Sequence, residues 1–155
     1  MPLCTLGSSC TIAAGGSLLW QFVALLVVHW IADFVLQTHW QASNKSKNNA
    51  ALAAHVWTYT GWLALATWFL FGPTWSSVGF VAVNGTLHFT TDWATSRASS
   101  ILFMEQLDTI QGRDIFRLVL KEKFTLHWFF VVVGFDQLAH QLTLAGTMMI
   151  IFGGP

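Results

Sequence analysis

Charged residues are scarce in this sequence. Of its 155 residues only 9% are charged, 54% are hydrophobic, and the mean hydropathy is +0.56. A water-soluble domain usually carries about 25% charged residues, so this chain has too little polar surface to remain in water. Seven basic residues balance seven acidic ones, and this zero net charge argues against nucleic acid as a partner. The composition therefore predicts an integral membrane protein whose partner is membrane lipid.

Cysteine is also scarce, and the signals of a cleaved export sequence are missing. The two cysteines, Cys4 and Cys10, lie in an uncharged leader over residues 1–17 that is rich in glycine and serine, and whether they form a disulfide is left open. The leader has no basic n-region, and no small-residue cleavage pattern follows the next apolar run. We therefore expect a flexible, non-cytoplasmic leader and a first apolar run that is retained as a helix.

Four apolar segments approach the length that crosses a bilayer. A helix needs about 20 residues to cross about 30 Å of hydrocarbon. The segments cover residues 18–38, 50–71, 77–98 and 124–152. They predict an all-α fold, a four-helix transmembrane bundle that forms a single domain over residues 18–152. Between the third and fourth segments, residues 113–123 place apolar side chains on one helix face and charges on the other, which predicts a short amphipathic helix on the membrane surface.

The basic residues predict the orientation of the bundle. Lys45 and Lys47 lie between the first and second segments. The other five lie at or between the facing ends of the third and fourth segments: Arg97, Arg113, Arg117, Lys121 and Lys123. Because Lys and Arg beside membrane helices stay on the cytoplasmic side, we expect both of these connections to be cytoplasmic and both termini to be non-cytoplasmic.

Three of the six histidines stand four residues from an aspartate. The pairs are His29 with Asp33, His88 with Asp92, and Asp136 with His140. A spacing of four places both members of a pair on one helix face, about one turn apart. The order is reversed in the fourth segment, which runs antiparallel to the first and third. The three histidines are therefore expected at one depth and the three aspartates about 5 to 6 Å nearer the cytoplasm, with His55 of the second segment at the aspartate level.

Aspartates inside a membrane require compensation. An ionised Asp at a helix centre costs about 2.5 to 3.5 kcal/mol, so three would cost roughly 8 to 10 kcal/mol. No lysine or arginine lies deep within the four segments, so bound cations are the simplest compensation. Mixed imidazole and carboxylate ligands suit zinc, manganese or iron, and the candidates outnumber the ligands of one tetrahedral ion. The pattern predicts two divalent ions bridged by an aspartate, with a hydrogen-bonded proton network as the alternative.

The predicted roles of the polar residues follow from this centre. The predicted metal ligands are His29, Asp33, His55, His88, Asp92, Asp136 and His140. Asp33 and Asp92 are also predicted to act in catalysis, as bridging or proton-accepting carboxylates. Gln37 and Gln137 are expected to orient a water or a substrate oxygen, or to hydrogen-bond a ligand. Arg97 is predicted to hold a phosphate or carboxylate of the substrate, or to anchor the helix at the headgroups.

The combined motifs resemble a known family. They are His29-x3-Asp33-Phe34-x2-Gln37, a lone His55, His88-x3-Asp92, and Asp136-Gln137-x2-His140. Together they resemble the bacterial and phage membrane family catalogued as domain of unknown function 3307, over roughly residues 20 to 145. The resemblance implies the same site residues and a bacterial inner-membrane location, but no reaction. A looser analogy is to small membrane-bound metal-dependent hydrolases, which also place His and Asp pairs in short helical bundles.

These observations favour one function over two others. The leading hypothesis is hydrolysis of a lipid-linked or amphipathic (phospho)ester at a two-metal centre that opens toward the cytoplasm. A transporter or channel for divalent metal or protons would use the same residues, but residues 18–28 and 62–71 are almost wholly apolar and offer no path. A phage-type protein acting by helix association would leave the buried aspartates unexplained. The metal, the substrate and any homo-oligomer are left open.

Overall fold

The described part of the protein is built from helices. The computed structural model describes the backbone of residues 9–110 and 115–154, and the side chains of residues 18–102 and 127–154. The elements are α1 (Ser9–Trp30), the short π-helix η1 (Ile31–Val35), α2 (His39–Asn44), α3 (Asn49–Phe71), α4 (Trp75–Ile110) and α5 (Ile115–Phe152). No strand occurs among these residues, so the all-α prediction is confirmed.

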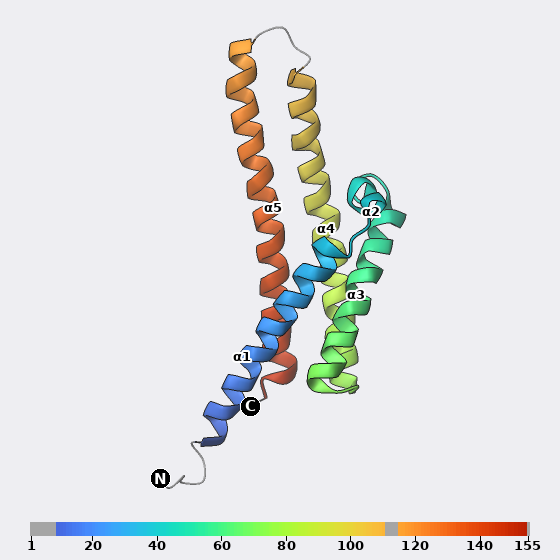
Figure 1. Ribbon diagram of the computed structural model, residues 1–155, viewed down its shortest axis with the longest axis vertical. Helices are drawn as coiled ribbons and strands as arrows, with labels where there is room; N and C mark the ends of the chain where they lie inside the picture. The colour runs from blue at the N-terminus through green and yellow to red at the C-terminus, as the bar shows by residue number, and fades with distance from the viewer. Residues whose placement is uncertain (1–8, 111–114, 155) are drawn as a thin grey trace.

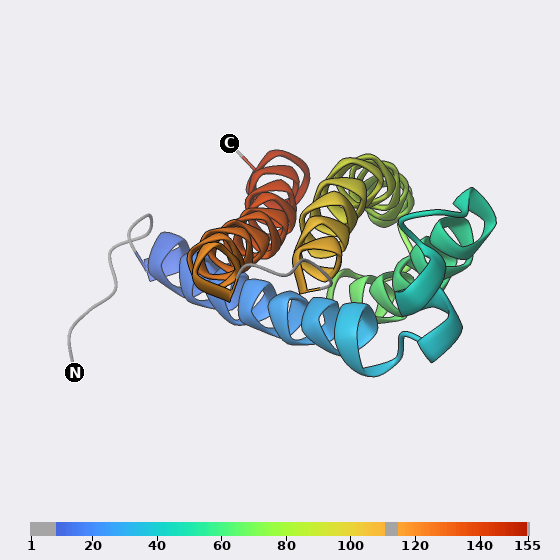
Figure 2. The same cartoon turned by 90° about the horizontal axis from the view of Figure 1, so that it is seen from above.

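Four long helices form the bundle (Figure 1). α4 packs against α3 and α5, and α1 packs against the same two helices, so the four close into a ring. α1 begins and α5 ends at the same end of the molecule as the α3–α4 turn, while α4 and α5 continue past the other helices at the opposite end (Figure 1). Seen from above, α1 runs obliquely along one side of the bundle (Figure 2). α3 and α4 approach closely at Gly85, where a Cβ would lie 2.8 Å from Thr60 Oγ1.

Several helix boundaries differ from those predicted. α1 begins at Ser9, nine residues earlier than expected and inside the predicted leader. The separate short helix predicted over residues 113–123 is wrong, because residues 115–123 form the first turns of α5 and residues 111–114 lie outside the described part. No proline interrupts α4 or α5, so each is one continuous helix that includes an apolar and a polar segment.

The connection from η1 to α3 is shaped by two side-chain caps. Thr38 begins α2 with a capping box: its Oγ1 accepts from the Gln41 backbone at 3.2 Å, and Gln41 Oε1 accepts from the Thr38 backbone at 2.8 Å. Asn48 caps α3 by accepting from the Ala50 backbone. Gln41 also donates to Thr58 on α3 at 3.3 Å, which holds α2 against the bundle.

The first transmembrane segment predicted from the sequence ends in a π-helix. The Leu36 backbone donates to the Ile31 carbonyl at 2.9 Å, a bond between residues five apart. Such wide turns are rare and often lie at functional sites. Here the wide turn contains Asp33, which is buried.

Evidence for membrane spans is limited to one helix. Among the described residues, the segment Leu18–Val35 is long and apolar enough to cross a membrane, which alone is weak evidence for a membrane location. The other three spans stay predictions. On the side of the cluster toward the α3–α4 turn, the helices bury an apolar layer of Leu25, Leu63, Phe80, Leu144 and Met148.

Candidate metal centre

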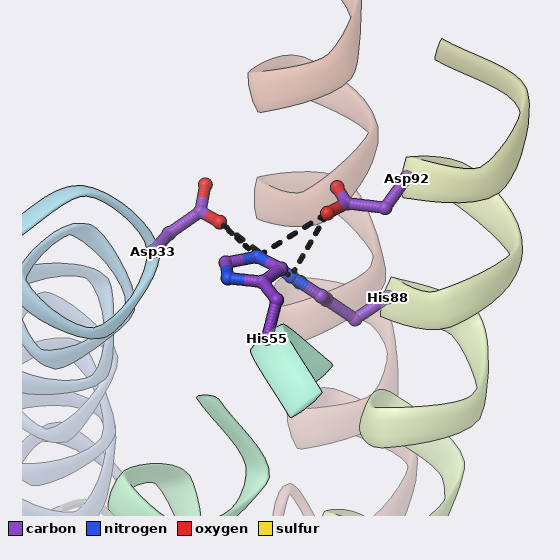
Figure 3. Close-up of side chains that lie close together, drawn as sticks. All are labelled: Asp33, His55, His88 and Asp92. Carbon is purple, nitrogen blue, oxygen red and sulfur yellow. Dashed lines mark hydrogen bonds and ion pairs between the residues drawn. The ribbon is translucent and has the colours of Figure 1, made fainter. Parts of the chain in front are cut away.

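Four side chains from three helices converge at the centre of the bundle. They are Asp33 of η1, His55 of α3, and His88 and Asp92 of α4, and all are buried (Figure 3). His55 Nε2 lies 2.9 Å from Asp33 Oδ1, 3.2 Å from Asp92 Oδ2 and 3.3 Å from His88 Nε2. His88 Nε2 lies 3.6 Å from Asp33 Oδ1 and 3.8 Å from Asp92 Oδ2. We call these four residues the first ligand group.

A second ligand group adjoins the first and consists of Asp92, Asp136 and His140. His140 Nε2 lies 3.1 Å from Asp92 Oδ1 and 3.5 Å from Asp136 Oδ1, and the three ligand atoms are within 4.8 Å of one another. Asp92 belongs to both groups. Its Oδ2 contacts His55 of the first group, and its Oδ1 contacts His140 of the second.

Helix register explains this convergence. His88 and Asp92 share one face of α4, and the antiparallel α5 carries its aspartate and histidine in the reverse order. The two pairs therefore meet along the α4–α5 contact. η1 and the beginning of α3 supply the remaining two side chains from the other half of the ring.

The first ligand group has the size of a tetrahedral metal site. Bonds of about 2.0 to 2.1 Å to four tetrahedral ligands place the ligand atoms about 3.4 Å apart. The five separations given for this group, 2.9 to 3.8 Å, bracket that value. Two imidazoles and two carboxylates suit zinc, manganese or iron. The second group offers three ligands and would leave a coordination position free for water or substrate.

A lysine reaches the cluster, contrary to expectation. Lys45, the C-cap residue of α2, places its Nζ 3.0 Å from Asp92 Oδ2, and its side chain is 20% exposed. Burial disfavours its charged form, but the carboxylates of Asp92 and Asp33 outweigh this and raise the pKa of Lys45 above its usual value. The expectation that no basic residue compensates the aspartates is therefore wrong. Lys45 neutralises only one of the three aspartate charges. The other two require protonated histidines or bound cations.

Hydrogen bonds hold the carboxylates in place. Gln137 Nε2 donates to Asp33 Oδ2 and to Asp136 Oδ2, each at 3.0 Å, and so links η1 to α5. The Thr95 hydroxyl donates to Asp136 Oδ1. Such partners orient metal-ligating carboxylates and raise their affinity. This placement agrees with the expected hydrogen-bonding role of Gln137.

Four predicted site residues lie outside the two ligand groups: Gln137, described above, and His29, Gln37 and Arg97. His29 is buried, and its ring centroid lies 5.3 Å from that of His140, but neither ring nitrogen has a hydrogen-bond partner among the described residues. Gln37 lines the cavity beside the cluster, and its Oε1 is buried without a partner in the described part of the chain.

Arg97 contacts neighbouring residues of α3 and α4 rather than the cavity. It donates to Asn49 Oδ1 at 2.7 Å, and its guanidinium lies 4.5 Å from the centre of the Trp93 ring. It is not among the described residues that line the cavity. The basic residues that do line it are Lys45 and Lys47.

The cavity opens onto both ligand groups and has a volume of about 610 Å³. Its floor includes Asp33, Asp92 and Asp136. Hydroxyl-bearing and basic residues line one part: Ser43, Lys45, Ser46, Lys47, Thr95, Ser96, Ser99 and Ser100. Phe34, Phe129 and Val133 line an apolar part.

The sequence reasoning missed Lys45, Thr95 and Tyr59. Tyr59 stacks on the His88 ring with centroids 3.9 Å apart. Thr95 follows Asp92 by three residues, so helix periodicity could have placed it beside the cluster. Tyr59 follows His55 by four residues and gave the same signal. The position of Lys45 in the sequence gave no such signal, because its contact with Asp92 depends on how the short helix α2 packs against the bundle.

The fold and the cluster define a helical bundle with a buried histidine–aspartate centre. The family described as protein of unknown function DUF3307 matches residues 21–153, most of the chain, and the protein therefore belongs to that family. No curated protein matches the chain. No solved structure matches it either.

Proposed function

We propose that this protein is a membrane-embedded, metal-dependent hydrolase of a lipid-linked or amphipathic (phospho)ester. The observation that carries the proposal is the position of Asp92. This one carboxylate joins a four-ligand group to a three-ligand group beside a cavity. Two ions that share a carboxylate and leave one position free are the arrangement used for metal-assisted hydrolysis.

A bound metal ion explains the geometry of the first ligand group better than hydrogen bonds between its side chains do. His55 Nε2 is within 3.3 Å of three atoms: Asp33 Oδ1, Asp92 Oδ2 and His88 Nε2. A ring nitrogen carries at most one proton, so it makes one good donor bond. His88 Nε2 lies 3.6 Å or more from both carboxylates, too far for hydrogen bonds. A cation at the centre of the four atoms would satisfy all of them at once.

The residues around the open position are suited to hydrolysis. When bound, the ions would supply a water of lowered pKa and neutralise an anionic transition state. Asp92 would fix the spacing of the two groups. Asp136, held by Thr95 and Gln137, is placed to accept a proton from the attacking water. Among the described residues the buried carbonyl oxygen of Gln37 has no hydrogen-bond partner, so it can accept a hydrogen bond from water or substrate in the same cavity.

The exposed aromatic side chains support a multi-pass membrane location. Trp20, Trp57, Phe69 and Trp75 are each 75% to 90% exposed. On α4 the exposed Trp75 and Trp93 are 18 residues, or about 27 Å, apart, which is close to the thickness of the hydrocarbon layer. Tryptophan favours both membrane interfaces. We place the connection that holds Lys45 and Lys47 on the cytoplasmic side of a bacterial inner membrane and both termini on the other.

The lining of the cavity supports an anionic, amphipathic substrate. Its hydroxyl and lysine side chains suit a phosphate group, and its floor of metal ligands suits the bond to be cleaved. Phe34 of η1, with Phe129 and Val133 of α5, offers an apolar surface for an acyl or isoprenoid chain.

Transport of metal or protons by the same centre is less well supported. An ion leaving the cluster toward the α3–α4 turn would have to pass the buried layer that includes Leu25, Phe80 and Leu144. The apolar side chains of this layer present no ligands, and a charge among them is strongly disfavoured. The buried polar side chains on the same side include Thr67 and Asn84, which carry no charge.

The test is phosphate release from protein in phospholipid nanodiscs that contain phosphatidate. We expect release that EDTA abolishes and zinc or manganese restores. Asp136→Asn should lower kcat by about 100-fold or more, because a proton acceptor and a ligand of the second group are lost together. His127→Ala is the matched control, since His127 is an exposed residue of α5 outside both ligand groups. Metal-dependent dye signals in sealed proteoliposomes, without hydrolysis of phosphatidate or 4-nitrophenyl phosphate, would refute the hydrolase and favour the transporter.

A further inference from the structure

Lys45 contacts the ligand cluster and also lines the cavity. Its Nζ contacts Asp92 Oδ2 at 3.0 Å, the same oxygen that lies 3.2 Å from His55 Nε2 in the first ligand group. An ammonium and a divalent ion held this close to one oxygen repel each other strongly where water is largely excluded. Both therefore cannot occupy their best positions on Asp92 together.

We infer that an ion entering the first ligand group displaces the Lys45 ammonium from Asp92 into the cavity, where it binds the phosphate group of an anionic ligand. This inference rests on the proposed function, because it requires the metal site. It adds an order of binding: the ion comes first and frees the residue that the anion then uses.

The surroundings of Lys45 permit this movement. Lys45 is the C-cap residue of the short helix α2, and its ammonium group is attached through a flexible chain of four carbons. Its side chain is partly exposed and already lines the cavity. Ser43, Ser46 and Ser96 line the same cavity and can donate hydrogen bonds to phosphate oxygens alongside the ammonium.

The inference predicts two effects of opposite sign. Without the Lys45 charge, an ion meets no competitor on Asp92, so metal should bind more tightly. Phosphate should bind more weakly, because the freed ammonium is missing. A lysine that only stabilises the fold would weaken both kinds of binding when it is replaced.

The experiment measures both affinities by titration calorimetry in nanodiscs. Lys45→Met removes the charge and keeps the apolar stem, and Lys47→Met from the same connection is the matched control for the Mn²⁺ measurement. Mn²⁺ binding is measured first. Inorganic phosphate binding is then measured with metal-free protein and with protein loaded with Mn²⁺ and freed of excess metal.

We expect wild type to bind phosphate only when loaded. Lys45→Met should bind Mn²⁺ at least about tenfold more tightly and phosphate at least about tenfold more weakly. Lys47→Met should leave Mn²⁺ affinity unchanged. If Lys45→Met does not fold, Lys45→Gln provides the neutral variant and Lys45→Arg, expected to keep phosphate binding, the charged one.

The outcomes separate this inference from the proposed function. If the wild-type protein binds no metal, both the proposed function and this inference are refuted. If the wild-type protein binds Mn²⁺ but Lys45→Met binds it equally well or more weakly, the inference is refuted and the proposed function is not. Equal phosphate affinity with and without metal also overturns it.

Discussion

Replacing Asp92 by asparagine keeps the shape of the side chain and removes the charge that both ligand groups share. The four-ligand group would fall to three good ligands and the three-ligand group to two. The loss of outer partners alone lowers metal affinity 10- to 100-fold, so the loss of a direct ligand should lower it by about 100-fold or more in each group. We therefore expect Asp92→Asn to lose both ions.

The effect should differ from that of a ligand confined to one group. His140→Ala removes a ligand of the second group only, and we expect it to retain one ion. His127→Ala should retain both. Asp92→Asn also leaves Lys45 without its carboxylate partner, so the metal-free variant should be less stable by about 1 to 3 kcal/mol.

Elemental analysis after desalting in metal-free buffer gives the number of ions per chain. The expected series is two in wild type, none in Asp92→Asn, one in His140→Ala and two in His127→Ala. Two ions retained in Asp92→Asn, or both lost in His140→Ala, would show that the groups do not share this carboxylate. A wild type without zinc, manganese or iron would refute the metal centre itself.

Three further predictions concern stability and topology. Adding zinc at about 1,000 times its Kd should raise the free energy of unfolding by about 4 kcal/mol, visible as a higher Tm that EDTA reverses. Gly85→Ala should destabilise by about 1 to 3 kcal/mol, because its Cβ would meet Thr60, whereas Gly79→Ala meets nothing within 4 Å and should leave Tm unchanged or slightly higher. In a background without the native cysteines, Ser46→Cys should react with an impermeant maleimide only from the cytoplasmic side and Thr74→Cys only from the other; labelling of both from one side would contradict the topology.

Periodicity explains why much of the cluster could be predicted. The spacing of four and its reversed order in the last segment depend only on helix geometry. They predicted that His88, Asp92, Asp136 and His140 lie together, and the structure brings them together. His55 was placed at the aspartate level, and its ring nitrogen contacts Asp33 and Asp92.

Other features depend on geometry that a periodic pattern does not contain. His29 was predicted as a ligand from its spacing to Asp33, and the structure places it beside the cluster but outside both ligand groups. Lys45 was assigned to a solvated connection, since nothing in the spacing shows that a capped short helix returns it to Asp92. The end of α4 and the beginning of α5 were misjudged because polar residues were taken as a break, although residues 99–110 and 115–123 contain no proline or glycine.

The π-turn has a consequence for how the chain can vary. Its five-residue hydrogen bond accommodates one amino acid more than an α-turn would. Deleting a single residue within this turn would remove the bulge and leave a regular helix. The orientation of the carboxylate is thus set separately from the packing of α1, so that a change on one side of the bulge need not disturb the other.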